Sequence, residues 1–232
     1  MDLAERLRSN LSRVKSEIAE ACLRAGRAPD SVRLVAVTKY VDSAVTSALL
    51  AAGATDLGEN RPQALVEKAE ALAHLNPRWH LIGHLQRNKI RKVLPHVHLL
   101  HAGDSWRLLE AVNVAAGELS RPVDVLLEVN VSGDTSKHGF HPQELTGLVP
   151  QLDNLGQVRV RGLMGMSGLE SSPAEKQVEF ARLRLLLERL QAEFPAARQW
   201  RELSMGMSDD FPAAIAEGST MVRVGSALFA GI

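Results

Sequence analysis

The chain has 232 residues, of which 45% are hydrophobic and 23% charged, which supports one buried core and excludes a disordered or fibrous chain. Lysine plus arginine and aspartate plus glutamate number 27 each, so no global basic field attracts nucleic acid or an anionic membrane. The one cysteine, Cys22, cannot form an internal disulfide, which excludes a disulfide-stapled scaffold.

The amino terminus is charged and lacks the apolar core of a signal peptide. No apolar run approaches the roughly 20 residues that a membrane-spanning helix needs. We therefore expect a cytoplasmic protein in a reducing compartment, with neither nucleic acid nor membrane as a partner.

An apolar stripe runs along the first 22 residues in steps of three or four, with arginine, lysine and glutamate between its members. This period predicts an amphipathic helix, which we expect to end near Gly26. The stripe consists of Leu3, Leu7, Leu11, Val14, Ile18 and Cys22. Cys22 is therefore interpreted as a small core residue.

After this helix, short apolar runs alternate with helix-like segments. The run 33–38 is nearly continuously apolar and rich in valine, which is typical of a strand buried on both faces of a parallel sheet. The other predicted strands are 55–58, 79–82, 97–100, 123–129, 158–163, 200–203 and 221–224. The predicted helices between them are 44–52, 62–73, 86–94, 105–119, 142–152, 174–194 and 211–216. Ser172, Pro173 and Glu175 supply an N-cap, a first-turn proline and a capping glutamate for the helix that follows them.

Eight strands alternating with helices predict an α/β fold, a (β/α)8 TIM barrel, in one domain that covers residues 1–232. The chain stops a few residues after the eighth predicted strand, so a full eighth helix is missing. We expect the first helix to cover the side of the barrel that this leaves bare. A doubly wound open sheet is the alternative, because periodicity alone does not reveal whether a sheet closes.

Reactive groups of such barrels lie at the carboxyl ends of the strands. Lys39 follows the first strand and shares a pleat face with Val35 and Val37, so its amine is expected inside the barrel. Burial would lower the pKa of this amine and leave it able to hold an aldehyde as a Schiff base. The alternative is an ordinary lysine that extends to solvent.

The ends of the last two strands resemble an anion site. Ser204, Met205 and Gly206 follow the seventh strand, and Gly225 and Ser226 follow the eighth, where barrels often bind a phosphate. Small residues let a ligand approach the backbone N–H groups. Glycines that merely form turns are the alternative.

Arg223 interrupts the apolar eighth strand and needs an acceptor if it faces inward. A ring nitrogen of a bound cofactor would serve, and an ion pair with Glu59 or Glu202 is the alternative. Three histidines of the fourth strand region, His96, His98 and His101, resemble metal ligands. Strand alternation sends only two of them to one face, so we interpret them as half-exposed strand residues and predict no metal.

Several blocks of this sequence closely resemble the pyridoxal phosphate homeostasis protein family, whose barrel is similar to the amino-terminal domain of alanine racemase. The resemblance covers the chain from about Val32 to its end. The blocks are LVAVTKY, LGENRPQ, WHLIGHLQRNK, LLEVNVSGDTSKHGF, GLMGMSG and LSMGMSDDFPAAIAEGSTMVRVGSALF.

This resemblance implies that pyridoxal phosphate is the cofactor and that Lys39 carries it as a Schiff base. It also implies that Arg223 faces the pyridine nitrogen and that Asn60 and His84 lie near the ring. The residues implied around the phosphate are Ser204, Met205, Gly225 and Ser226.

The main hypothesis for function is a protein that holds pyridoxal phosphate and hands it on, with no catalytic residues of its own. A racemase needs acid and base groups on both faces of its substrate, and the chain has no second domain to supply one. Its one tyrosine, Tyr40, should point away from Lys39 by strand alternation. Arg223 in place of a carboxylate also makes the ring a poorer electron sink.

The expected partners are the cofactor and apoenzymes that depend on it, and we expect a monomer. The second hypothesis is an amino-acid racemase or related lyase in which His84 or a water supplies the missing proton. The third is a Schiff-base aldolase that acts on a sugar phosphate without a cofactor.

Overall fold

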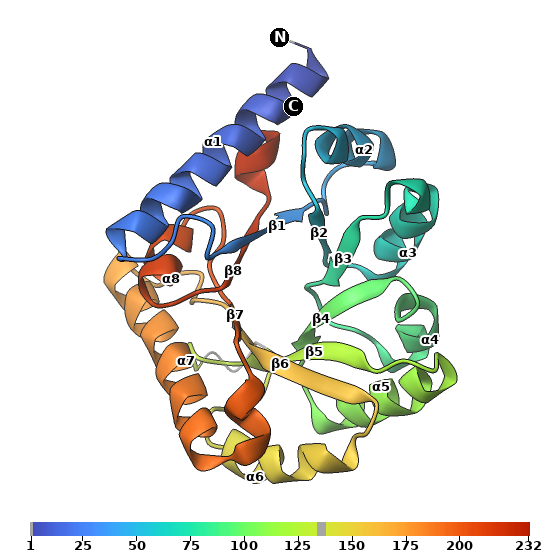
Figure 1. Cartoon of the computed structure of the whole chain (residues 1–232), viewed down its shortest axis with the longest axis vertical. Helices are drawn as coiled ribbons and strands as arrows, with labels where there is room; N and C mark the ends of the chain where they lie inside the picture. Colours follow the sequence, from blue (N-terminus) through green and yellow to red (C-terminus); the bar gives the residue numbers. More distant parts are fainter. Residues whose placement is uncertain (1, 134–137) are drawn as a thin grey trace.

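Eight parallel strands close into a barrel in the computed structural model of the chain, which describes residues 2–133 and 138–232 (Figure 1). Strands that are consecutive in sequence are neighbours around the barrel, and β8 closes it by pairing with β1, Met221 opposite Arg33. The predicted (β/α)8 barrel is confirmed, and the alternative of an open sheet is wrong.

The strands lie close to their predicted positions, and β5 and β8 match them at both ends. Their bounds are β1 (Arg33–Val37), β2 (Asp56–Glu59), β3 (Arg78–Leu81), β4 (Val97–Gly103), β5 (Val123–Val129), β6 (Val158–Gly165), β7 (Glu202–Ser204) and β8 (Met221–Val224). β4 runs three residues beyond its predicted end. Gly103 permits this, because a Cβ there would lie 2.7 Å from the carbonyl oxygen of Leu126 on the neighbouring strand.

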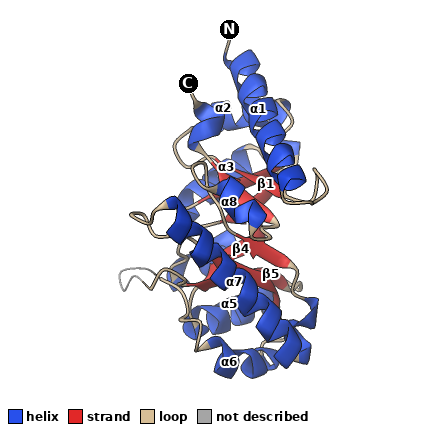
Figure 2. Cartoon of the chain, turned by 90° about the vertical axis from the view of Figure 1, so that its left-hand side faces the viewer, coloured by secondary structure: helices blue, strands red, loops and turns tan. Residues whose placement is uncertain are grey.

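The helices follow the strands on the outside of the barrel (Figures 1 and 2). Their bounds are α1 (Leu3–Arg24), α2 (Ser43–Ala51), α3 (Pro62–Ala71), α4 (Ile90–Val93), α5 (Trp106–Glu118), α6 (Leu145–Leu148), α7 (Pro173–Glu193) and α8 (Phe211–Ala216). The predicted helices 86–94 and 142–152 each contain only one α-helical turn, joined to the 3-10 segments η2 (Arg87–Lys89) and η3 (Val149–Asn154). In the second case Pro150 has no N–H to continue an α-helix.

The first helix occupies the place of an eighth outer helix. Its buried face includes Leu7 and Leu11, and Cys22 is fully buried, as predicted. The polar face contacts the chain end: Asn10 donates to the carbonyl oxygens of Leu228 and Ala230 at 3.0 and 3.1 Å. Figure 1 shows α1 beside the segment that follows β8, which ends in the 3-10 turn η5 (Ser226–Phe229).

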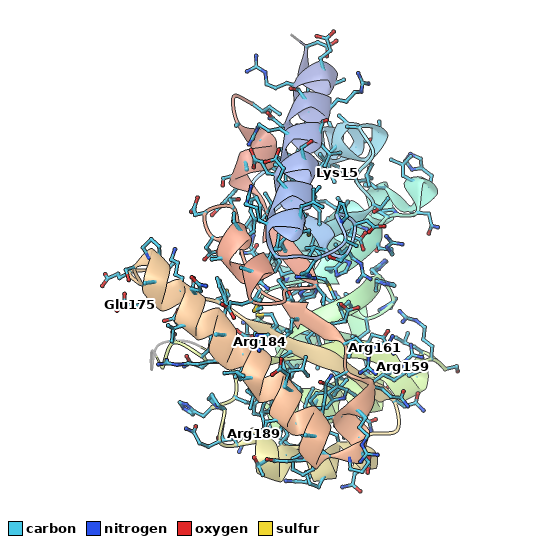
Figure 3. The ribbon with its side chains drawn as sticks, turned by 60° about the vertical axis from the view of Figure 1, so that its left-hand side comes forward. Lys15, Arg159, Arg161, Glu175, Arg184 and Arg189 are labelled. Atoms are coloured by element: carbon cyan, nitrogen blue, oxygen red, sulfur yellow. The ribbon has the colours of Figure 1, made fainter. Side chains whose placement is uncertain are left out.

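The start of α7 has the predicted cap. The Ser172 side chain accepts from the backbone of Glu175, and the Glu175 carboxylate accepts from the backbone of Ser172. Glu175 lies at one end of α7 in Figure 3, with Arg184 and Arg189 further along the same helix.

Two apolar layers hold the barrel together. The larger lies between strands and helices, and a smaller cluster fills the barrel interior. The interior cluster consists of Val35, Leu99, Ala102, Leu126, Met164 and Met221, with Met166 packed against it. In the described part of the chain, no helix is long and apolar enough to cross a membrane.

Candidate functional site

Lys39 comes two residues after the end of β1, and the residue before it is held from three sides. The Thr38 hydroxyl donates to Glu59 Oε1 at 2.9 Å, and Lys68 of α3 donates to the Thr38 carbonyl at 2.8 Å. Lys68 also forms a close ion pair with the fully buried Glu59. These contacts, together with the bond from Thr38 N to the Gly58 carbonyl at 2.9 Å, fix the backbone that presents Lys39.

The expected burial of Lys39 inside the barrel is met only in part. β1 ends at Val37, so Lys39 and Tyr40 lie in a turn where strand alternation no longer applies. Lys39 is half-buried, and its Nζ lies 4.7 Å from the centroid of the Tyr40 ring, which is 85% exposed. Tyr40 therefore does not point away from Lys39, contrary to the prediction.

The segment after β7 divides into a buried and an exposed part. Ser204 and Met205 are fully buried, whereas Ser208 is partly exposed and accepts a hydrogen bond from Gly225 N at 3.3 Å. Gly206 makes this turn possible: it has a φ of +95°, and a Cβ there would lie 2.6 Å from the Ala214 Cβ of α8. Ser208 thus joins Gly225 at the mouth of the barrel, next to the exposed Ser226.

Ser208 is not among the residues that the resemblance implies around a phosphate. Three residues separate Ser204 from Ser208, and only the turn at Gly206 decides which hydroxyl reaches the surface. Ser208 could have been identified from the end of β7. Because β7 ends at Ser204, residues beyond the following turn lie closer to the rim of the barrel than Ser204 does.

Arg223 lies inside the barrel on β8 and is 4% exposed. Its Nη1 donates to the Ser204 carbonyl and hydroxyl oxygens at 2.7 and 2.6 Å, and Nη2 donates to the Gly165 carbonyl at 3.0 Å. Among the described residues, these bonds use three of its five N–H groups. Burial lowers the pKa of Arg223 to about 10, so it stays charged at neutral pH.

The alternative interpretation of Arg223, an ion pair with a nearby glutamate, is wrong. Glu59 pairs with Lys68 at the end of β2, and Glu202 lies 3.7 Å from Arg33. Within the described residues Arg223 has no carboxylate within ion-pair distance. Its hydrogen-bond acceptors are neutral carbonyl and hydroxyl oxygens, so they do not neutralise the positive charge of the guanidinium.

His84 follows β3 and forms a short contact with Asp104 at the end of β4. The distance from His84 Nδ1 to Asp104 Oδ2 is 2.6 Å, and the His138 ring stacks on His84 with centroids 4.7 Å apart. Gly83 brings this loop against β2, because a Cβ there would lie 2.3 Å from the carbonyl oxygen of Asn60. Asn60 and His84 are both exposed at the same end of the barrel.

Ligand atoms of His84, Asp104 and His138 lie within 4.8 Å of one another. The two rings are nearly parallel, at 17°, so their in-plane lone pairs do not converge on one point where an ion could bind both. The arrangement instead suits His84 as a proton donor or acceptor oriented by a carboxylate.

Glu128 is a site residue that sequence reasoning missed. It is the sixth residue of β5 and is 6% exposed. Burial, reinforced by the charge of Asp104, raises the pKa of Glu128 to about 7, although the charges of Arg223 and His84 oppose the shift. The available signal was a glutamate that interrupts the otherwise apolar end of a strand, the same signal that identified Arg223.

His101 also differs from its interpretation as a half-exposed strand residue, because it is fully buried. The pairing of β4 with β5 shifts in register between Leu100 and Gly103, which breaks the alternation on which the prediction depended. His101 Nδ1 lies 2.9 Å from Ser204 Oγ, inside the barrel.

The sequence profile of the family described as "Alanine racemase, N-terminal domain" matches residues 5–231. The chain is therefore an α/β barrel of this class. The pyridoxal phosphate homeostasis protein of Pseudomonas aeruginosa is 40% identical over 220 residues, which cover 95% of this chain and 93% of the relative. That of Aquifex aeolicus is 39% identical and covers 94% and 95%. The chain belongs to the family of pyridoxal phosphate homeostasis proteins.

Solved structures agree with this assignment. A protein of unknown function from Bifidobacterium adolescentis has a TM-score of 0.93 and 38% identity, covering 99% of this chain and 97% of its own. PipY of Synechococcus elongatus with PLP bound has a TM-score of 0.85 and 39% identity, covering 98% of this chain and 100% of its own. D-threonine aldolase from Filomicrobium marinum shares the fold alone, at 18% identity and a TM-score of 0.73, and this chain spans 60% of its length.

Proposed function

We propose that the protein binds pyridoxal phosphate at the carboxyl end of the barrel and takes part in controlling its supply inside the cell. The observation that carries the proposal is that three kinds of group lie at one end of the barrel. They are the amine of Lys39, the buried charge of Arg223, and the serine and glycine residues that follow β7 and β8. The similar PipY protein, whose structure is described with PLP bound, supports the same ligand.

Each part of the cofactor has a matching group on this chain. Lys39 holds the aldehyde carbon as a Schiff base, and Arg223 donates a hydrogen bond to the pyridine nitrogen. Asn60 and His84 lie beside the ring. Ser208, Gly225 and Ser226 surround the phosphate, with Ser204 and Met205 forming the buried layer beneath it.

The proposed role is to hold and deliver the cofactor, not to catalyse. Pyridoxal phosphate supplies a reactive aldehyde and an electron-withdrawing ring when bound. A guanidinium at the pyridine nitrogen does not favour a protonated ring, so the ring withdraws electrons less strongly than it would beside a carboxylate. The relatives are named as homeostasis proteins, which supports the same role. We further propose that the protein is a cytoplasmic monomer that supplies apoenzymes.

The decisive experiment measures delivery and catalysis on the same loaded protein. Incubation with an apoenzyme that requires pyridoxal phosphate is expected to restore that enzyme's activity. Deuterium from solvent is expected to enter the α-position of free amino acids slowly or not at all, because Lys39 offers a base on only one face. Turnover on the order of 1–10 per second with any amino acid, the ordinary range for enzymes, would contradict the carrier role.

Loss of the serine hydroxyls near Gly225 is expected to weaken the phosphate contact selectively. Ser208→Ala combined with Ser226→Ala should weaken binding of pyridoxal phosphate much more than binding of pyridoxal, by about tenfold or more per lost charge-assisted hydrogen bond. Equilibrium titration of both ligands measures this, with Ser12→Ala on the exposed face of α1 as the matched control. Equal loss for the two ligands would place the phosphate elsewhere.

One observation favours the second candidate, an enzyme of amino-acid chemistry. The 2.6 Å contact between His84 and Asp104 is an arrangement that orients a histidine for proton transfer. If this candidate is correct, the exchange assay gives rapid deuterium incorporation, and His84→Gln abolishes it while the protein still binds the cofactor. The aldolase hypothesis predicts instead a protein that never acquires the visible absorbance of a bound cofactor.

A further inference from the structure

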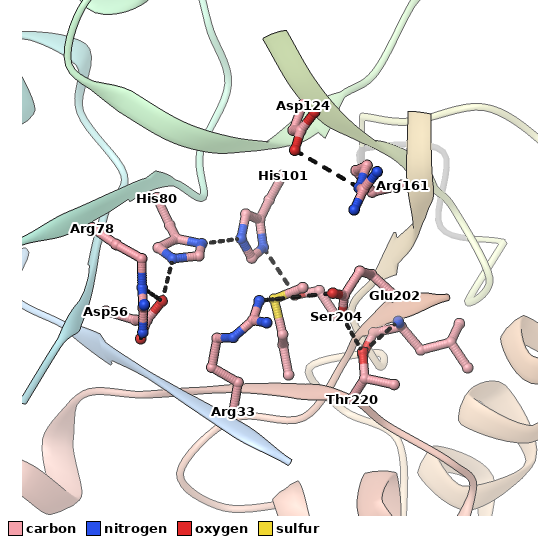
Figure 4. A network of polar contacts seen from close by, with 12 residues as sticks. Arg33, Asp56, Arg78, His80, His101, Asp124, Arg161, Glu202, Ser204 and Thr220 are labelled. Carbon is pink, nitrogen blue, oxygen red and sulfur yellow. Dashed lines mark hydrogen bonds and ion pairs between the residues drawn. The ribbon is translucent and has the colours of Figure 1, made fainter. Parts of the chain in front are cut away.

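A continuous chain of polar side chains runs through the barrel interior to Arg223, and Figure 4 shows its part from Asp56 through His80 and His101 to Ser204. Arg223 Nη1 donates to Ser204 Oγ at 2.6 Å, and Ser204 Oγ lies 2.9 Å from His101 Nδ1. His101 Nε2 lies 2.9 Å from His80 Nδ1, and His80 Nε2 lies 3.0 Å from Asp56 Oδ1. All five side chains are buried, at 4% exposure or less.

The far end of this chain reaches the amino-terminal end of the barrel. Asp56 and Arg78 are the first residues of β2 and β3. Arg78 donates to both carboxylate oxygens of Asp56, at 2.9 and 2.7 Å, and its side chain is 51% exposed. Both residues line a cavity of about 520 Å³ at that end. The chain of contacts therefore joins the two ends of the barrel.

The positions of the protons follow from the charges. Burial raises the pKa of Asp56, but hydrogen bonds from His80 and Arg78 outweigh this and leave its pKa well below the ordinary value. Asp56 is thus an ionised acceptor. Burial lowers the pKa of His80, and burial together with the charge of Arg223 lowers that of His101, so both rings are neutral.

A neutral imidazole donates from one nitrogen and accepts at the other. Because Asp56 accepts, His80 carries its proton on Nε2 and accepts at Nδ1. His101 must then donate from Nε2 and accept at Nδ1. The Ser204 hydroxyl therefore donates to His101, which leaves its lone pairs for Arg223. The ionised Asp56 thus fixes the direction of the hydrogen bonds from His80 to Ser204, and the guanidinium of Arg223, which can only donate, fixes the last one.

We propose that Asp56, His80 and His101 are positioning residues that fix the Ser204 hydroxyl as an acceptor and so hold the Arg223 guanidinium in place for the pyridine ring of the cofactor. This inference rests on the proposed function. We call the series Asp56, His80 and His101 the relay. Without it, the Ser204 hydroxyl loses its acceptor at His101 and its side chain is free to leave the position in which Oγ accepts from Arg223, so the guanidinium loses one of its three hydrogen-bond acceptors.

The proton order is tested first, on the full-length protein without cofactor. Nitrogen-15 NMR at neutral pH is expected to give neutral Nε2–H tautomers for His80 and His101. Arg78 contacts both carboxylate oxygens of Asp56, and His80 shares Oδ1 with it, so the single amide oxygen of Asp56→Asn cannot replace all three acceptor contacts. The preference of His80 and His101 for the Nε2–H tautomer is therefore expected to weaken, and the Nδ1–H tautomer is expected to appear for both. A cationic ring or an Nδ1–H tautomer in the unchanged protein would overturn the relay.

The matched control is Asp124→Asn. Asp124 is also a carboxylate at the amino-terminal end of the barrel, where it accepts from Arg159 at 2.7 Å and lies 3.7 Å from Arg161. Figure 3 labels both arginines, and Figure 4 draws Asp124 apart from the histidine chain. Asp124→Asn is expected to leave both tautomers unchanged. A switch in this control would mean that general electrostatics and not the relay sets them, which contradicts the proposal.

The link to the cofactor is tested with two variants of His101. His101→Leu removes the acceptor for Ser204, and the dissociation constant for pyridoxal phosphate is expected to rise about tenfold, the equivalent of one net hydrogen bond, with a changed visible spectrum. His101→Asn keeps an amide oxygen near the Nδ1 position and is expected to restore the spectrum and the affinity.

These outcomes separate the inference from the function on which it rests. If the unchanged protein binds no pyridoxal phosphate, the proposed function fails, while the NMR result still decides the proton order. If it binds the cofactor and both Asp56→Asn and His101→Leu retain its spectrum and affinity, the positioning role is wrong. If His101→Leu does not fold, Asp56→Asn is expected to show the same rise in the dissociation constant for pyridoxal phosphate, and its control Asp124→Asn is expected to leave that constant unchanged.

Discussion

Lys39→Ala is expected to abolish the visible absorbance of the protein loaded with pyridoxal phosphate. The amine is the only group proposed to bond covalently to the cofactor, so its removal leaves a ligand held by its phosphate and ring alone. Borohydride reduction, digestion and mass spectrometry should give a pyridoxyl adduct on the peptide that contains Lys39. Lys92→Ala, an exposed lysine on α4, is the matched control and should keep both signals.

The barrel is expected to stay folded in this variant. The Lys39 side chain contacts the exposed Tyr40 ring, and such a contact contributes about 0.5–1 kcal/mol. Thr38, held by Glu59 and Lys68, keeps the backbone in place. Circular dichroism and urea unfolding check this. A Lys39→Ala protein that stays yellow with an adduct on another lysine would contradict the assignment.

The architecture could be predicted from the sequence because a strand that is buried on both faces of a sheet is a nearly continuous run of apolar residues. A strand such as 123–129 is almost continuously apolar, and the helix after it shows a period of three to four. The repeated alternation then admits few topologies, since parallel neighbours need a crossover between them. The capping box at Ser172 is similarly local, so it could be predicted from three residues.

The parts of the site that could not be predicted depend on interactions between distant segments. His101 faces the interior because the pairing of β4 with β5 shifts in register, which the residues of β4 alone do not reveal. The relay joins side chains from five strands, each of which looks like an isolated polar residue in the sequence. The position of Lys39 depends on where β1 stops, and strand ends are the least certain feature of a periodic pattern.

Deletion of residues 1–25 is expected to give an aggregating protein. Leu7, Leu11, Val14 and Ile18 are at most 3% exposed, and they cover the side of the barrel where an eighth outer helix would lie. Burial of four such side chains contributes roughly 6–10 kcal/mol as an upper estimate, which is comparable to the whole stability of a domain. The deletion also removes the hydrogen bonds from Asn10 to the chain end.

A graded version of this experiment keeps the chain complete. Leu7→Ala is expected to lower the free energy of unfolding by about 2–5 kcal/mol, because the side chain is fully buried and its loss leaves a cavity. Leu23→Ala on the same helix is the control, since Leu23 is 61% exposed and its loss should change stability by about 0.5 kcal/mol or less. Urea unfolding measures both. A truncated protein that is soluble and still binds pyridoxal phosphate, together with equal effects of the two leucine variants, would show that α1 is an appendage and that the barrel closes without it.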